Sequence, residues 1–300
     1  MRLPKIPRIP RVKDIRSKLA SARLLGGVAK NSIMFKLKRR ALRRFRSREF
    51  DTIIVDMDGT LYDTDANLES LIYLYPEKNE EGKTAGEDLY DSIISKIASG
   101  QYSIERAIVE GNKFLVARKM SRADFLAVLA RIRPTLRLPL VDALKKIRGG
   151  GKTLVLATLS SKDFGDMLNS GLKKRFGLEF DLVVGTEMNF DSENKICGIR
   201  SMVGTKDFRY GGIPVNTKLS AIRDGMELIG REFDVKKSVL ITDSYSDIDI
   251  AQALTTILVK PENPTIAQKV SQRLKLADYI LADDEDLGTN LESIVLGPEK

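Results

Sequence analysis

The sequence predicts an α/β fold in which a parallel sheet lies between layers of helices. Short apolar runs rich in β-branched residues alternate with longer amphipathic stretches, a pattern typical of parallel strands joined by helices. Short connections and right-handed crossovers would arrange these elements as a Rossmann-like three-layer sandwich. The predicted strands are Thr52–Val55, Thr153–Thr158, Asp181–Val184, Ser238–Thr242, Thr256–Val259 and Asp278–Leu281.

Helices are expected to follow or precede these strands. The predicted helices are Leu140–Ile147, Asp163–Leu172, one that opens near Asn216 and carries Leu219, Ile222, Met226 and Ile229, then Ser246–Leu254 and Pro264–Leu274. Between Tyr62 and about Pro134 the apolar residues recur at helical spacing alone, which predicts several helices in succession. These are too many for an ordinary connection, so we expect a helical unit inserted after the first strand.

Two carboxylates directly follow the first predicted strand. Asp56 and Asp58 are two residues apart, and Gly59 then lets the chain turn. This places both acids at the carboxyl end of a strand, where open α/β sheets bind ligands. Successive side chains of a strand point to opposite faces, but a turn that begins at Met57 can bring Asp58 back beside Asp56. One carboxylate could then attack a substrate while the other moves a proton.

The signature D-x-D-G-T at residues 56–60 resembles the first motif of the haloacid dehalogenase-like phosphohydrolases. Candidates for the three further motifs follow in order, at Thr158, at Lys218 and at the pair Asp243 and Asp247. Because all four occur in order, with the strand-borne ones at strand ends, the chain is identified as a member of this family over about residues 50–282. The helical insertion and the hairpin-like segment 189–210 are most similar to the phosphoserine-phosphatase-like subgroup, whose helical insertion is called a C1 cap.

The resemblance implies a domain organisation with three parts. Residues 1–49 form a basic amphipathic N-terminal extension, residues 63–134 form the helical C1 cap, and residues 50–62 and 135–300 form the catalytic core. A cap beside the site can exclude water and read the leaving group.

The resemblance also implies Mg²⁺ as the cofactor and an aspartyl-phosphate as the intermediate. Asp56 is expected to be the nucleophile and a metal ligand, and Asp58 the general acid and base, with its backbone carbonyl on the metal. Asp243 supplies a second carboxylate to the metal. The expected substrate is a small phosphorylated metabolite, and the enzyme is a phosphoric monoester hydrolase.

Four further polar residues receive roles from the same resemblance. Thr158 and Lys218 are expected to bind the phosphoryl oxygens, and Asp247 to orient Lys218 or a metal-bound water. Asp65 is a candidate for substrate specificity, because the subgroup often has a Glu at this position. For Thr158 and Lys218 alternatives remain open, because the neighbouring residues Ser160, Ser161 or Lys206 could fill these roles instead.

The composition excludes several classes of enzyme. The 300-residue chain contains no histidine, which removes Ser-His-Asp triads, imidazole metal sites and phosphohistidine intermediates. Acid–base chemistry must therefore come from carboxylates, Lys, Tyr or the single cysteine, Cys197. One cysteine cannot form an intrachain disulfide, so nothing favours an oxidising compartment, and a cytoplasmic location is expected. Two other functions remain open: a phosphomutase of the same family, and a binding protein that uses this fold as a scaffold.

The N-terminal extension differs from the rest of the chain in charge. Residues 1–49 hold 17 Lys and Arg against two acidic residues, a net charge of +15, while the remainder holds 33 against 39, a net charge of −6. Three prolines favour an extended start, and residues 14–45 then predict a cationic helix with an apolar stripe. A solvated tail, an organellar transit peptide and a helix peripheral to an anionic membrane are the interpretations that remain open. Nucleic acid is disfavoured, because the extension offers few aromatic residues for stacking on bases. The sequence does not decide the oligomeric state.

The membrane interpretation predicts binding that can be separated from catalysis. We expect the full-length protein to sediment with anionic but not with neutral vesicles, because each basic residue near an anionic surface contributes about 1 kcal/mol. High salt should release the protein, because it screens this attraction. Deleting residues 1–48 should abolish vesicle binding and leave hydrolysis of a water-soluble ester nearly unchanged. Binding that survives the deletion, or a preference for RNA over lipid at matched salt, would contradict the membrane interpretation.

Overall fold

The computed structural model describes residues 49–243, 247–260 and 277–297, and in these residues a nine-stranded sheet forms the centre of the molecule. The strands lie in the order β5-β6-β4-β3-β2-β1-β7-β8-β9. From β3 to β9 the neighbours are parallel, whereas β4 is antiparallel to β3 and β5 is antiparallel to β6. The bounds are β1 Thr52–Asp56, β2 Thr153–Ser161, β3 Leu182–Phe190, β4 Ile196–Gly204, β5 Phe208–Tyr210, β6 Ile213–Thr217, β7 Ser238–Thr242, β8 Thr255–Lys260 and β9 Tyr279–Ala282.

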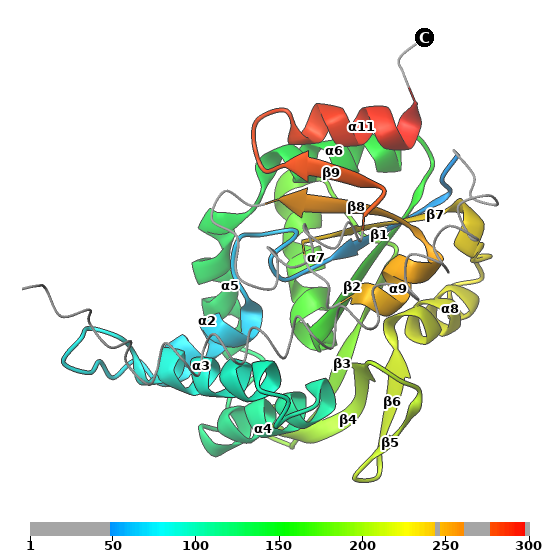
Figure 1. Ribbon diagram of the computed structural model, residues 1–300. Coiled ribbons are helices and arrows are strands. Elements are labelled where there is room, and N and C mark those ends of the chain that lie inside the picture. The colour runs from blue at the N-terminus through cyan, green and yellow to red at the C-terminus, as the bar shows by residue number, and fades with distance from the viewer. Residues whose placement is uncertain (1–48, 244–246, 261–276, 298–300) are drawn as a thin grey trace, which may run out of the picture.

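Helices cover both faces of this sheet, which confirms the predicted three-layer α/β sandwich (Figure 1). On one face α6, α7 and α11 pack on the central strands, and on the other face α8 and α9 do so. The bounds of the helices are α2 Ala66–Leu74, α3 Ala85–Ala98, α4 Ile104–Ala117, α5 Asp124–Ile132, α6 Leu138–Gly149, α7 Lys162–Phe176, α8 Lys218–Leu228, α9 Ile248–Ala253 and α11 Leu287–Leu296.

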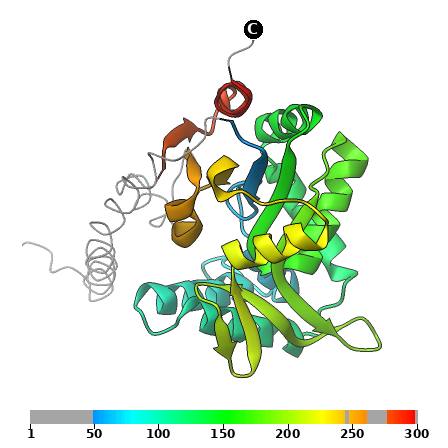
Figure 2. The same cartoon turned by 90° about the vertical axis from the view of Figure 1, so that its right-hand side faces the viewer.

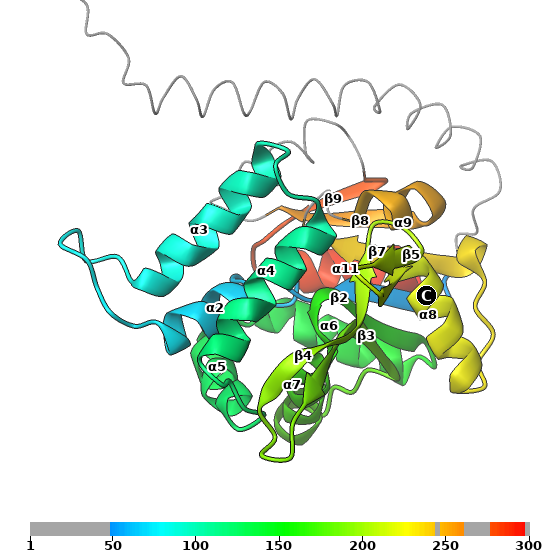
Figure 3. The same ribbon diagram turned by 90° about the horizontal axis from the view of Figure 1, so that it is seen from below.

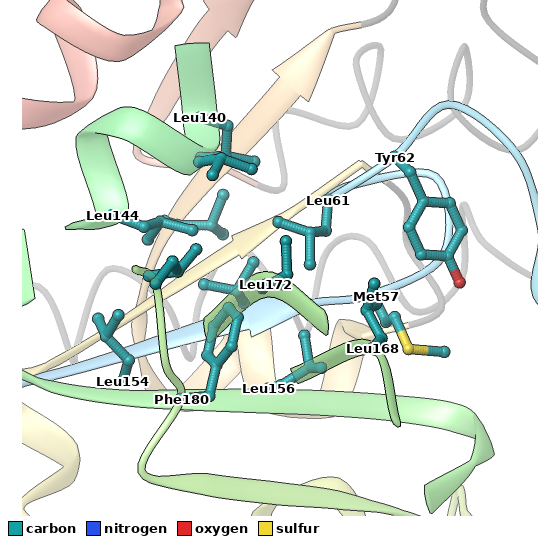
Figure 4. Packing of buried hydrophobic residues seen from close by; sticks show 14 of the residues in the cluster. Met57, Leu61, Tyr62, Leu140, Leu144, Leu154, Leu156, Leu168, Leu172 and Phe180 are labelled. Carbon is teal, nitrogen blue, oxygen red and sulfur yellow. The ribbon is translucent and has the colours of Figure 1, made fainter. Parts of the chain in front are cut away.

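The first strand is buried on both sides. Ile53 and Val55 pack into the core beneath α6 and α7, while Ile54, which points to the opposite face, packs with residues of α8 and α9. Figure 4 shows the first of these cores, in which Met57 and Leu61 lie among leucines of α6, β2 and α7. The turn that carries the predicted acids is therefore anchored by buried apolar residues on either side of Asp58.

Four helices, α2 to α5, follow β1 in the chain and lie within the predicted cap segment, residues 63–134. Helices α2, α3 and α4 lie at the same end of the molecule as β4, β5 and β6 (Figures 1 and 2). Seen from that end, α3 and α4 run side by side next to α2 (Figure 3). A capping box between Thr84 and Glu87 starts α3. Gly86 is needed there, because a Cβ at this position would lie 2.3 Å from the Leu71 carbonyl oxygen of α2.

The structure differs from the prediction in three elements. Strand β3 continues past the predicted Val184 to Phe190, because β4 pairs with this extension, and such a long-range pairing is not visible in local periodicity. The hairpin expected over residues 189–210 is instead divided between the antiparallel pairs β3–β4 and β5–β6. Helix α11 was not predicted. The predicted helix Pro264–Leu274 and the N-terminal extension lie outside the described residues, among which no helix has the length and apolarity needed to span a bilayer.

A buried arginine at the start of α6 holds the turn after β1 in place. The side chain of Arg137 is only 4% exposed and donates to the carbonyl oxygens of Gly59 and Thr60 at 2.8 and 3.0 Å. It also pairs with Asp63 at 2.9 Å and with Asp283 at 2.7 Å. One guanidinium thus satisfies two backbone acceptors and two carboxylates, which come from residues 59–63 and from Asp283.

Replacing this arginine should be costly. Arg137→Met should lower the free energy of unfolding by about 3–5 kcal/mol, because it leaves buried acceptors and a carboxylate without a partner. Arg131→Met is the matched control, since the half-exposed pair of Arg131 with Glu69 should contribute less than about 1 kcal/mol. Urea unfolding of both variants measures the difference, and similar losses would show that Arg137 does not anchor the turn.

Candidate active site

The predicted site residues meet at the carboxyl ends of the central strands. Asp56 is the last residue of β1, and the parallel neighbours β2 and β7 bring residues 158 and 243 to the same edge. A cavity of about 670 Å³ opens there and continues between the cap helices. Among the predicted site residues, those that line this cavity are Asp56, Asp58, Asp65, Thr158, Lys218 and Asp243. Asp247 lies behind them and contacts Lys218.

Lys218 forms a buried bridge between two carboxylates. It is the first residue of α8, and its Nζ lies 2.8 Å from Asp56 Oδ1 and also pairs with Asp247. Burial and the charge of Asp247 raise the pKa of Asp56 well above its usual range, while Lys218 acts in the opposite direction. Although burial alone would lower the pKa of Lys218, the charges of Asp247 and Asp56 raise it, so this lysine stays charged.

Asp58 is held by four hydrogen bonds. Its Oδ1 accepts from the Tyr62 hydroxyl at 2.5 Å and from the backbone N–H of Ala66 at 2.7 Å, at the first turn of α2. Its Oδ2 accepts from the hydroxyls of Thr158 at 3.1 Å and Ser160 at 2.6 Å. The four donors fix the position of this carboxylate at the edge of the cavity.

A close approach of backbone and carboxylate explains Gly59. Its φ of +73° favours glycine, and a Cβ at this position would lie 2.4 Å from Asp243 Oδ2. The next residue, Thr60, donates its hydroxyl to Asp243 Oδ1 at 3.1 Å. The turn after β1 and the end of β7 therefore fit together only with glycine at position 59.

Asp65 is positioned between two cap helices. It caps α2 by accepting from the backbone N–H groups of Asn67 and Leu68, and its second oxygen accepts from the Tyr90 hydroxyl of α3 at 2.8 Å. Burial and the charge of Asp58 raise the pKa of Asp65 to about 7. Asp65 thus lines the cavity as predicted, but its oxygens already accept three hydrogen bonds from the protein.

Sequence reasoning missed several residues of this site. Tyr62 follows Asp58 by four positions and Ser160 follows Thr158 by two, so proximity along the chain was a usable signal for both. Asn67 donates to the Ser160 hydroxyl at 2.8 Å and so supports the same cluster. Arg137 and Tyr90 reach the site from distant segments, and no local pattern indicates them. Of the alternatives to Thr158 and Lys218, Ser160 and Ser161 line the cavity, and Lys206 is exposed.

The site carries an excess of negative charge that a hard cation would balance. Asp56 and Asp247 pair with the ammonium group of Lys218, Asp58 and Asp243 line the same cavity, and oxygen ligands of this kind suit Mg²⁺. In the part of the chain that the structure describes, no three acidic or cysteine side chains form a metal cage by themselves. The Mg²⁺ ligands implied by the resemblance are only the carboxylates of Asp56 and Asp243 and the backbone carbonyl of Asp58. Water molecules occupy the remaining coordination positions in Mg²⁺ sites of this kind. The donors present therefore fit Mg²⁺.

The comparisons with known proteins agree with this geometry. The profile of the haloacid dehalogenase-like hydrolases matches residues 53–252, two thirds of the chain, and all four motifs lie within this range. The chain belongs to the haloacid dehalogenase-like hydrolase family. Comparison with curated proteins gives no match.

Solved structures share the fold at low sequence identity. A hydrolase of this family, t0658 from Salmonella enterica serovar Typhi, gives a TM-score of 0.59 at 16% identity, covering 84% of this chain and 73% of its own. A phosphoserine phosphatase solved as a phospho-aspartyl intermediate analogue gives 0.56 at 14% identity, covering 81% and 98%. Cytosolic 5'-nucleotidase IIIB bound to cytidine gives 0.54 at 14% identity, covering 85% and 89%. The fold is thus that of phosphoserine-phosphatase-like members of the family.

The buried bridge predicts a pH-dependent loss of stability when its lysine is removed. Lys218→Met should lower the free energy of unfolding by about 3–5 kcal/mol near neutral pH, because Asp56 and Asp247 lose their buried counter-charge. Removal of the lysine raises the pKa of Asp56 in the folded protein further above the pKa that this residue has in the unfolded chain. The folded state of the variant then binds more protons than its unfolded state does. Lowering the pH should therefore recover part of the lost stability.

Urea unfolding at about pH 8 and about pH 5 measures this effect. Lys162→Met is the control, because Lys162 pairs with Asp166 on the surface of α7 and should show a small loss at both pH values. A deficit of Lys218→Met that grows on acidification would contradict the bridge as the source of the effect.

Proposed function

We propose that this protein is a Mg²⁺-dependent phosphomonoester hydrolase that acts on a small phosphorylated metabolite through an aspartyl-phosphate intermediate. The observation that carries the proposal is the placement of Asp56 and Asp58 on one cavity, each held differently. Asp56 is fixed through one oxygen by a charged lysine, whereas Asp58 is surrounded by hydroxyl and backbone donors. Two carboxylates in different surroundings are suited to a nucleophile and a proton carrier.

Asp56 is the nucleophile in this mechanism. Lys218 holds Oδ1, so Oδ2 attacks phosphorus in line with the ester oxygen, and the bond from phosphorus to that oxygen breaks as the new bond forms. Lys218 and the hydroxyl of Thr158 bind the phosphoryl oxygens, over which the transition state spreads its charge. A bound Mg²⁺, held by Asp56, Asp243 and the Asp58 carbonyl, would supply further charge neutralisation there.

Asp58 is the general acid and base. In its protonated form it gives a proton to the departing alkoxide, and it then accepts a proton from the water that hydrolyses the aspartyl-phosphate. Burial and the charge of Asp58 raise the pKa of Tyr62, so this hydroxyl keeps its proton and remains a donor to Asp58. Asp247 does not face the cavity, and its role is to position Lys218.

The first test of this function is ester hydrolysis. The protein should hydrolyse p-nitrophenyl phosphate with Mg²⁺ and lose turnover with EDTA.

Asp56→Asn should lower kcat by more than about 1,000-fold, because it removes the nucleophile. Asp58→Asn should slow both half-reactions and leave a phosphorylated protein that intact-mass spectrometry detects after quenching. Asp142→Asn, on the exposed side of α6, is the control and should keep full activity. Undiminished turnover by Asp56→Asn would overturn the proposal.

A further inference from the structure

The cavity at the catalytic acids has a second, apolar end. From Asp56 and Asp58 it extends between α2, α3 and α4, where aliphatic side chains make its wall. The principal ones are Leu68, Ile93, Ile94, Ile97, Ile104 and Ile108. Its volume of about 670 Å³ is that of a pocket for a drug-sized ligand, which exceeds what a phosphate on a short polar alcohol requires.

The side of α3 that carries Ile93, Ile94 and Ile97 is not buried in the protein core, although Leu89 and Tyr90 of the same helix pack against that core. This helix, which the structure describes in full, buries only Gly86. Ile93 and Ile97 are half-buried and Ile94 is 43% exposed, yet all three line the cavity. Beside the contact of Ile93 with α4 at Gly111, this aliphatic stripe faces the cavity and leaves apolar surface in water, which a ligand of matching character would cover.

The charges along the cavity oppose a second anionic group on the substrate. Among the described residues that line it, Lys218 supplies the positive charge, and Asp56 and Asp247 already pair with it. The other charged side chains of the lining are carboxylates; among them Asp65 lies between the catalytic end and the cap, and Asp63 is paired with Arg137, which lies outside the lining. A carboxylate or a second phosphate on the alcohol would therefore find no free cation among these residues and would be repelled.

One polar atom interrupts the apolar wall. Asn112 of α4 lines the cavity, and its buried Oδ1 has no hydrogen-bond partner among the described residues. This oxygen is closed to solvent, so the cavity does not expose it directly, and the unpaired amide makes the wall polar at this one point of α4.

We propose that the substrate is the phosphomonoester of an amphiphilic alcohol, with a hydrocarbon chain that lies between α3 and α4. This inference rests on the proposed function and names its substrate class. The phosphate lies at Asp56 and Lys218, and the chain covers Ile93 and Ile97. Phosphate esters of amino acids and bisphosphates are disfavoured by the acidic lining.

A chain-length series with the full-length protein tests the proposal. Ethyl, butyl, hexyl and octyl phosphate are hydrolysed with Mg²⁺ below their micelle concentrations, with phosphoserine as the polar comparison. We expect kcat/KM to rise along the series by up to about 4-fold per methylene, the gain from burying one methylene group. Phosphoserine should be slower than octyl phosphate. A flat series, or phosphoserine as the best substrate, would overturn the inference and leave the proposed function intact. The proposed function itself fails if no ester is hydrolysed or if Asp56→Asn keeps full turnover.

Variants of the two helices locate the chain. Ile93→Asn should reduce the ratio of kcat/KM for octyl phosphate to that for ethyl phosphate by about 10-fold or more, because a polar group replaces wall surface. Asn112→Leu, similar in size, should raise this ratio, since a plain alkyl chain then no longer covers an unpaired amide. Leu126→Asn is the control, because this leucine is 60% exposed on α5 and lies outside the cavity. The same ratio in all four proteins would show that the chain does not bind between α3 and α4.

Discussion

The buried ion pairs of Lys218 are the interaction on which the rest of the site depends. Parallel strands bring Asp56 and Asp243 to one edge of the sheet, and Asp247 follows at the start of α9, so negative charge gathers where little water can screen it. Without a cation, carboxylates in such a place would take up protons and would cease to be nucleophiles. Because Lys218 begins α8, the packing of that helix against Ile54 and Val155 also fixes the position of the charge.

A second support acts on the backbone that follows Asp56, the proposed nucleophile. Arg137 binds the carbonyl groups of Gly59 and Thr60, and Thr60 in turn holds Asp243. The turn after β1 thus lies between a lysine that fixes Asp56 and an arginine that fixes the following backbone. Both cations are buried, and each is held by ion pairs with two carboxylates. These contacts explain how a loop can keep the side chains of the site in fixed positions.

Local sequence predicted which residues line the site better than it predicted the residues that surround and support them. The sheet, its flanking helices and the motif residues could be predicted, because strand ends, turns and carboxylate spacing are properties of short segments. Arg137, Tyr90 and Asn112 could not, because their roles come from contacts across many residues of chain. The stripe of Ile93 and Ile97 was visible as helical periodicity, but periodicity alone cannot tell whether an apolar face meets a neighbouring helix or a cavity.

Helix α3 of the predicted cap and Asp58, the proposed general acid, are physically connected through α2. Asp65 caps this helix and accepts from Tyr90 of α3, while the first backbone N–H of the same helix, at Ala66, donates to Asp58. A shift of α3 relative to the sheet would therefore act on Asp65, on the start of α2 and so on the hydrogen bonds of Asp58. The helices that surround the alcohol part of a substrate are in this way coupled to the group that gives the alcohol its proton. Occupation of the apolar end of the cavity would then favour the arrangement in which Asp58 is correctly held.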